Sequence, residues 1–284
     1  MAHNVNTYTG IPGSLVIVRG GGDISTGTIH RLYRAGFPVL ILEAARPSAI
    51  RRRVAFSEAV YDGAATVEGV TAARIAGVDA IGATLSRGEV PLLVDPAGDS
   101  IRQLRPAAVV DAILAKRNLG TSMDMAPLTV ALGPGFTAGQ DAHYVIETMR
   151  GHDLGRIIAS GSATPNTGIP GKIGGYGIER VIHAPAAGVF HMCRDIGSIV
   201  DAGEVIGDIG TPEGAIPVRA KIAGLLRGVL RDGYPVTRGF KLADVDPRLD
   251  QLENCATISD KARCIADSVL ELICTQANRE RRLR

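Results

Sequence analysis

The chain has 284 residues, of which 45% are hydrophobic, and its 31 Lys and Arg nearly balance 29 Asp and Glu, giving a net charge of +2. This length and composition predict a globular protein large enough for two domains. The small net charge argues against a nucleic-acid or membrane-surface role. Apolar runs fall short of the roughly 20 residues of a membrane-spanning helix, and the start MAHNVNTYTG lacks a signal-peptide core, so we expect a cytoplasmic location.

The first predicted element is an apolar strand that begins at Leu15 and runs into the turn RGGGD. Glycines at a strand-to-helix turn let backbone N–H groups approach a ligand, and the positive end of the following helix favours an anion. A helix is predicted over residues 24–35, and the next strand, VLILE, ends at Glu43. An acidic side chain there, 21 positions after Gly22 (43 − 22), would bond ribose hydroxyls in a dinucleotide-binding fold. We therefore predict a cofactor site formed by Gly20, Gly21, Gly22, Asp23 and Glu43.

A second interpretation of this turn stays open. Gly20, Gly22 and Gly27 have the spacing GxGxxxxG, whereas the dinucleotide fingerprint is GxGxxG and has a glycine where Ser25 stands. The glycines are also compatible with a tight turn that only permits close helix packing. Asp23 is expected to cap the helix, because a carboxylate would repel an anion beside it.

Further apolar strands are predicted over residues 90–95, 107–114 and 128–132, and together they favour a parallel sheet covered on both faces. The last strand runs into a second glycine-rich turn, GPGFTAG, after which another helix is expected. Two such turns at one edge of a sheet would face each other across a ligand crevice. We predict that this turn contributes Gly133, Gly135, Phe136 and Thr137 to the same site.

Residues 176–250 contain an internal repeat, in which pairs such as Gly188 and Gly224 stand 36 positions apart (224 − 188). Short β-branched runs between glycine turns predict a small all-β module of two pseudosymmetric halves. This organisation resembles the barrel-sandwich hybrid of biotinyl and lipoyl carrier domains. The segment that joins the halves, residues 210–219, contains no lysine for biotin or lipoate attachment, so a carrier role is not expected.

The end of the chain, from Ser259, has the apolar spacing of an amphipathic helix followed by a basic tail. The predicted fold class is therefore α/β, with a Rossmann-like parallel-sheet domain, a barrel-sandwich hybrid domain and a C-terminal helix. The expected boundaries are 1–166, 176–250 and 251–284.

The sequence contains no Ser-His-Asp elbow, HExxH pair or P-loop lysine motif. We therefore name no catalytic residue and no metal ligand, and the sequence does not determine whether the protein is an enzyme. His143 and His152 are expected to be structural hydrogen-bonding groups.

Four cysteines form no CxxC pair, which argues against a zinc ribbon or a thioredoxin-like motif. Cys255, Cys264 and Cys274 are expected to be buried thiols. The arginines at 51–53 form the one basic cluster near the predicted cofactor site, and a solvated helix face and anion recognition both explain them.

Several long motifs together resemble the YqeB family, the accessory proteins of selenium-dependent molybdenum hydroxylases. They are VRGGGDISTG, LGPGFTAGQDAHYVIETMRGHDLGR, TPNTGIPG, GEVIGDIG, LADVDPR and ISDKA. The resemblance implies a role in maturing a molybdenum hydroxylase, with the hydroxylase apoprotein as partner and a molybdopterin-type cofactor or nucleotide as ligand. Molybdopterin carries a phosphate, which glycine turns over helix N-termini would suit.

Two other functions remain possible on the sequence alone. A nicotinamide-dependent oxidoreductase would use Glu43 for the ribose, and tight NAD binding with turnover would reveal it. A non-enzymatic docking module would bind a partner through the β domain and leave the crevice empty, so it would copurify with a hydroxylase without binding small molecules.

Overall fold

The computed structural model describes residues 15–168 and 171–282, so the polar start of the sequence and the last two residues of the basic tail lie outside the described residues. The chain forms two compact units. The first contains the chain up to Pro47, Ala55–Asn166 and everything from Ile258 onward. The second contains Ser48–Val54 and Thr167–Thr257. The C-terminal helix is therefore part of the first unit, and a short early segment is part of the second.

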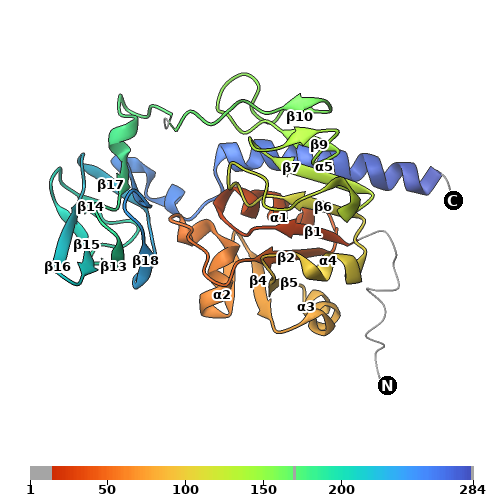
Figure 1. The fold of residues 1–284 in the computed structure, drawn as a ribbon, viewed down its shortest axis with the longest axis horizontal. Helices are drawn as coiled ribbons and strands as arrows, with labels where there is room; N and C mark the ends of the chain where they lie inside the picture. The colour runs from red at the N-terminus through yellow and green to blue at the C-terminus, as the bar shows by residue number, and fades with distance from the viewer. Residues whose placement is uncertain (1–14, 169–170, 283–284) are drawn as a thin grey trace. The chain divides into compact units, whose positions relative to one another are not determined.

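The first unit is built on a nine-stranded mixed sheet with the strand order β10-β9-β7-β6-β1-β2-β5-β4-β3 (Figure 1). The strands from β9 to β4 in this order run parallel, whereas β10 and β3 are antiparallel to their neighbours. The bounds are β1 Val16–Arg19, β2 Val39–Glu43, β3 Ala64–Val67, β4 Val70–Ile75, β5 Val90–Val94, β6 Ala108–Asp111, β7 Leu128–Leu132, β9 Tyr144–Ile146 and β10 Ile157–Ile158. A separate two-stranded sheet pairs β8 (Thr137–Ala138) with β11 (Gly161–Ser162).

Helices cover this sheet where the apolar strands need burial on both faces. The helices α1 (Asp23–Arg34) and α5 (Asp260–Arg282) pack against each other, and α5 also contacts β7 and β9. A separate apolar cluster joins Ile81 of α3 (Ile81–Ser86) and Ile101 of α4 (Asp99–Leu104) to buried side chains of β1, β2 and β6. The remaining helix, α2 (Ala59–Asp62), is a single turn.

The predicted fold class is wrong for this unit, because the sheet is mixed and not parallel. No α-helix lies between β6 and β7 or between β7 and β9, so the helix expected after the second glycine turn is absent and β8 forms there instead. Gly133, Gly135 and Gly139 all have positive φ angles, from +83° to +106°. A backbone in that conformation cannot continue as a right-handed helix.

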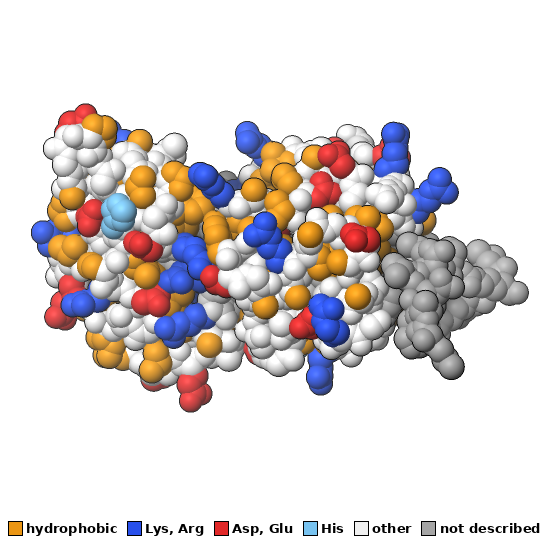
Figure 2. All heavy atoms as spheres, turned by 90° about the horizontal axis from the view of Figure 1, so that it is seen from below, with side chains coloured by type: hydrophobic (Ala, Val, Ile, Leu, Met, Phe, Trp, Pro, Cys, Tyr) orange, Lys and Arg blue, Asp and Glu red, His pale blue; other side chains and the backbone are white. Residues whose placement is uncertain are grey.

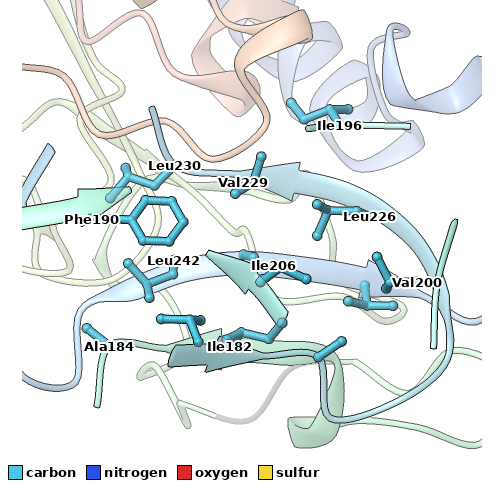
Figure 3. Close-up of a cluster of buried hydrophobic side chains, with 14 of the residues drawn as sticks. Ile182, Ala184, Phe190, Ile196, Val200, Ile206, Leu226, Val229, Leu230 and Leu242 are labelled. Atoms are coloured by element: carbon cyan, nitrogen blue, oxygen red, sulfur yellow. The ribbon is translucent and has the colours of Figure 1, made fainter. Parts of the chain in front are cut away.

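The second unit consists of two four-stranded antiparallel sheets, in place of the predicted barrel-sandwich hybrid. One has the order β12-β19-β17-β14 and the other β16-β15-β13-β18. The bounds are β12 Val181–His183, β13 Gly188–Met192, β14 Ile199–Val200, β15 Val205–Thr211, β16 Gly214–Arg219, β17 Gly224–Val229, β18 Tyr234–Val236 and β19 Lys241–Asp246. Side chains from both sheets form one buried core, in which Phe190, Ile206, Leu226 and Leu242 lie close together (Figure 3).

The internal repeat corresponds to equivalent strands of the two sheets. β13 and β17 begin at Gly188 and Gly224, whose φ angles are +156° and +158°. A side chain at either position would overlap a backbone carbonyl oxygen of the neighbouring strand, that of Gly210 or that of Asp246. Glycine therefore recurs in both halves because the neighbouring strand passes very close.

The arginine triplet, residues 51–53, lies in the second unit, where two of its side chains donate hydrogen bonds to backbone carbonyl oxygens. The Arg51 guanidinium donates to the carbonyl oxygens of Asn254 (2.9 Å) and Thr257 (3.2 Å). Nε of Arg52 donates to the carbonyl oxygen of Val229 at 2.9 Å. These bonds tie the segment 48–54 to two distant parts of the chain, and this is a structural use that neither sequence interpretation of the triplet included.

Among the cysteines, Cys255 is buried, and burial raises the pKa of its thiol. Cys264 and Cys274 are half-buried, so the expectation of a buried thiol is wrong for these two.

Acidic and basic side chains are intermixed on the face drawn in Figure 2. No helix within the described ranges is long and apolar enough to cross a membrane.

Candidate functional site

The first glycine turn lies at the carboxyl end of β1, between the carboxyl ends of β2 and β6. The chain continues from β1 to β2 on one side and comes back as β6 on the other. Open α/β sheets bind ligands at such a point, because the loops on its two sides turn away from each other. The residues predicted from the first turn, and Glu43 at the end of β2, lie at this point of the sheet.

Close packing explains two of the three glycines in this turn. Gly20 has φ +97°, and a Cβ added to it would lie 2.9 Å from the carbonyl oxygen of Ala112. A Cβ on Gly21 would lie 2.9 Å from the backbone nitrogen of Ser57. Both glycines are needed because another segment of backbone passes against them.

Gly22 is different, because a Cβ added to it would meet no atom within 4 Å. It is the N-cap residue of α1 and, as a glycine, has no side chain with which to cap the helix. Asp23 is the first residue of the helix and therefore does not cap it as the sequence predicted. The space beside Gly22 is the place in this turn where a ligand could approach the helix N-terminus.

Glu43 lies at the end of β2 and binds the glycine turn directly. Its Oε2 accepts the N–H of Gly21 at 2.6 Å, and its Oε1 accepts the N–H of Ala44 at 2.7 Å. Burial raises the pKa of this carboxyl, although the two backbone hydrogen bonds act in the opposite direction. Since both oxygens already accept backbone hydrogen bonds, this geometry does not favour the predicted bond from Glu43 to a ribose.

The glycines of the second turn are also explained by neighbouring backbone and side chains. A Cβ on Gly133 would lie 2.7 Å from Oγ1 of Thr148, and one on Gly135 would lie 2.5 Å from the backbone nitrogen of Arg117. The segment 112–117 after β6 packs against the first turn at Ala112 and against the second turn at Arg117. It therefore lies between the two turns, where the sequence had predicted a crevice.

The other two residues predicted from this turn have structural contacts. Phe136 is only 3% exposed and belongs to a small apolar cluster beneath β8 and β9. The backbone N–H of Thr137 donates to Asp141 Oδ2 at 2.7 Å, and its hydroxyl lies 3.1 Å from the hydroxyl of Ser162. Both residues stabilise the local loop, and a ligand-binding role for them stays a prediction.

A lysine that the sequence did not single out, Lys261, precedes Ala262, which packs against Gly27 of α1. Lys261 is in the first turn of α5, and the charges of Arg150, Asp23, Glu147 and Asp260 all act on it. Burial is the largest cause that lowers the pKa of Lys261, and Arg150 lowers it further. The sequence signal that could have found it is the motif ISDKA, which was used for the family resemblance alone.

Two of the neighbouring charges, Arg150 and Asp260, compensate each other, whereas Glu147 and Asp23 leave negative charge beside Lys261. Arg150 forms a bidentate ion pair with Asp260, with distances of 2.7 and 2.8 Å. Glu147, which follows β9, accepts the backbone N–H groups of Met149 and Thr164, both at 2.7 Å, and such bonds lower its pKa.

A buried charged network lies beside the first turn. Arg19, the last residue of β1, donates to Thr121 Oγ1 at 2.5 Å and to the carbonyl oxygen of Pro96 at 3.2 Å. Thr121 in turn donates to Asp111 Oδ2 at 2.5 Å, and burial raises the pKa of Asp111. Arg19 and Asp111 are each 1% exposed, so the network fixes the ends of β1 and β6 and is not accessible to a ligand.

Of the two histidines considered from the sequence, one has a structural hydrogen bond and the other lies at the surface. Nδ1 of His143 accepts the backbone N–H of Thr129 at 3.0 Å, which confirms its predicted structural role. His152 is exposed. Within the part of the chain that the structure describes, no group of three or more His, Cys, Asp or Glu side chains could hold a metal ion.

Comparison with known proteins supports the resemblance found in the motifs. No protein-family model matches the chain. It is 52% identical over 260 residues to the uncharacterized protein YqeB of Escherichia coli (strain K12). This chain is a relative of YqeB. The alignment covers 91% of this chain and 47% of YqeB, so the chain spans about half the length of the curated relative it matches. The similarity to YqeB is thereby confirmed, and the molybdenum hydroxylase role stays a prediction.

Solved structures give weaker similarities. One is a succinylglutamate desuccinylase/aspartoacylase from Rhodobacter sphaeroides, at 16% identity and a TM-score of 0.28, covering 83% of this chain and 86% of that one. Another is an aspartoacylase family protein from Mesorhizobium loti, at 13% identity and a TM-score of 0.29, covering 82% and 85%. TM-scores this low do not indicate a shared fold, so nothing in these names is carried over to this chain.

Proposed function

We propose that this chain binds a small phosphate-bearing ligand beside Gly22, at the N-terminus of α1. The observation that carries the proposal is the unobstructed space at Gly22 together with the partly buried ammonium of Lys261. A helix N-terminus presents N–H groups and a positive dipole end to an anion, and the N-cap residue of α1 is a glycine, which has no side chain to cap it. Lys261 would add a positive charge in surroundings that water screens less than a fully exposed site.

Asp23 is the group that sets the requirements on the ligand. Its carboxylate acts on Lys261 and would repel a phosphate placed against it. A ligand whose phosphate is attached to a larger body can place the phosphate at Lys261 and away from Asp23. Nucleotides and pterin cofactors have such a body, whereas inorganic phosphate does not.

We further propose that the ligand is a molybdopterin-type cofactor, and that the chain is an accessory protein in the maturation of a selenium-dependent molybdenum hydroxylase. The motif resemblance to the YqeB family supports this proposal, and the 52% identity to YqeB supports the resemblance. The hydroxylase apoprotein would be the protein partner. The engagement of both Glu43 oxygens makes the nicotinamide-dependent alternative less favourable.

Isothermal titration of the purified chain with pyrophosphate, nucleoside monophosphates, NAD and molybdopterin tests the site. We expect molybdopterin or a nucleotide to bind, and Lys261→Met to weaken that binding about 10- to 100-fold, since a hydrogen bond to a charged group contributes about 1.5–3 kcal/mol. Lys221→Met, which changes an exposed lysine of the second unit, is the matched control and should bind as the wild type does.

Two results would count against the proposal. Binding of none of these compounds would remove the ligand site, and copurification with a hydroxylase in that case would favour the docking-module alternative. Binding that Lys261→Met leaves unchanged would place the ligand elsewhere on the chain.

A further inference from the structure

A cavity lies along α4. Its volume is about 910 Å³, and its walls include Ala107, which precedes β6, and Pro127, which precedes β7. These two residues mark the amino ends of two parallel strands, whereas Gly98, the N-cap of α4, follows the carboxyl end of β5. None of the described residues that line the cavity belongs to either glycine turn, and the cavity size is within the range typical of small-molecule pockets.

Part of the cavity lining is apolar. Ile101 of α4 and Met125 both line it, and both also pack in the apolar cluster of β1, β2 and β6. Ile101 is only 3% exposed, whereas Met125 is half-buried, so Met125 supplies most of the apolar surface that these two residues offer to a ligand. A ligand with an apolar body would bury this surface from water.

The lining also contains two arginines, Arg102 and Arg105, and both are exposed. Neither guanidinium has an ion-pair partner among the described residues. The one acidic side chain of the lining, Asp124, already accepts a hydrogen bond from the hydroxyl of Ser122. The cavity therefore has an excess of positive charge, and its cations are available for a ligand.

Arg105 is held in an unusual backbone conformation. It ends α4 with φ +46° and ψ +62°, the left-handed region in which a non-glycine residue costs on the order of 1 kcal/mol. Glycine would adopt this conformation without cost, and it is the usual residue at the end of a helix. An arginine at a position that suits glycine indicates that its side chain has a use, and the cavity beside it supplies one.

We propose that this cavity binds an organic anion, with its acidic group on Arg102 and Arg105 and its apolar body against Ile101 and Met125. The guanidinium fork matches the geometry of a carboxylate, a sulfonate or a phosphate monoester. The apolar wall excludes small inorganic anions as the preferred occupant, because they would leave it in contact with water.

The probe for this site is 8-anilinonaphthalene-1-sulfonate, an aromatic sulfonate whose fluorescence rises in apolar surroundings. We expect the folded chain to bind it saturably and in a 1:1 ratio. The double variant R102Q/R105G should bind it at least tenfold more weakly. Arg105→Gly suits the backbone conformation, and Arg102 is exposed, so this variant should keep the fold and have an unchanged denaturation midpoint or a raised one.

Two further variants make the test specific to the cavity. Ser122→Trp places a large side chain at an exposed position of the lining and should also weaken binding at least tenfold. Arg87→Gln removes an exposed arginine at the end of α3, outside the cavity, and should bind the probe as the wild type does. The absence of saturable binding, or binding at wild-type strength by R102Q/R105G or Ser122→Trp, would overturn the proposal.

Discussion

The adjacent glycines Gly21 and Gly22 should differ greatly in how much the same substitution destabilises the protein. Gly21→Ala places a Cβ 2.9 Å from the backbone nitrogen of Ser57, about 0.5 Å closer than an ordinary contact. Gly22→Ala places its Cβ where no atom lies within 4 Å. Neither position has a positive φ angle, so the difference between the two variants measures packing and not backbone strain.

The expected magnitudes follow from what must move. To admit a Cβ at Gly21, the backbone at Ser57 must shift, although its N–H donates to the carbonyl oxygen of Gly21 at 2.8 Å. The shift also disturbs the bond from Gly21 to Glu43. Overpacking costs about 1–3 kcal/mol and a weakened charge-assisted hydrogen bond adds to it, so we expect Gly21→Ala to cost about 3 kcal/mol. At Gly22, the lower entropy of the unfolded chain and the preference of N-caps for glycine over alanine nearly cancel, which leaves a change within about 0.5 kcal/mol.

Guanidinium unfolding followed by far-UV circular dichroism measures both changes. With a slope of about 4 kcal/mol per molar denaturant, Gly21→Ala should lower the midpoint by about 0.7 M, and Gly22→Ala should move it by about 0.1 M or less. Equal shifts for the two variants would refute the packing argument. Gly22→Ala serves a second purpose, because its Cβ enters the space proposed for the ligand and should weaken ligand binding while the fold is intact.

Three further predictions concern buried charge and the repeat, each checked by denaturant unfolding. Asp244→Asn should lower the free energy of unfolding by about 3 kcal/mol, because it leaves the buried guanidinium of Arg180 without its charged partner. Asp208, which stands 36 positions earlier in the repeat (244 − 208), is half-exposed, so Asp208→Asn should cost less than about 0.5 kcal/mol. Similar costs for the two variants would contradict this reasoning. Burial raises the pKa of the Glu43 carboxyl, so the folded state binds the carboxyl proton more tightly than the unfolded state does. The stability of the wild type relative to Glu43→Gln should therefore fall as pH rises from about 4.3, the unfolded pKa, through the raised pKa of the folded state. A relative stability that rises over this pH range would disprove the prediction. Gly224→Ala should destabilise the second unit by about 3 kcal/mol or more, because its φ of +158° and a neighbouring carbonyl oxygen both exclude a Cβ; a wild-type midpoint would show that the strands can separate.

Some of this protein could be predicted from local sequence patterns. The elements β1, α1 and β2 follow from an apolar run, a glycine turn, a helical stretch ended by Gly36 and a second apolar run. The repeat is visible because equivalent strands meet the same steric limit at Gly188 and Gly224. In both cases the information lies within a few residues of chain, where side-chain periodicity and glycine conformation act directly.

The tertiary structure alone determined which segments meet. The antiparallel edge strands β3 and β10, the segment 112–117 between the glycine turns and the arginine triplet inside the second unit all depend on partners far away in sequence. The same is true of the site. A Cβ on Gly27 of α1 would lie 2.8 Å from the Cβ of Ala262, so α5 packs closely on α1. This packing brings Lys261, which precedes Ala262, close enough to Asp23 for the two charges to interact. No local pattern predicts that approach, because hydrophobic burial specifies that a face must be covered and not which part of the chain covers it.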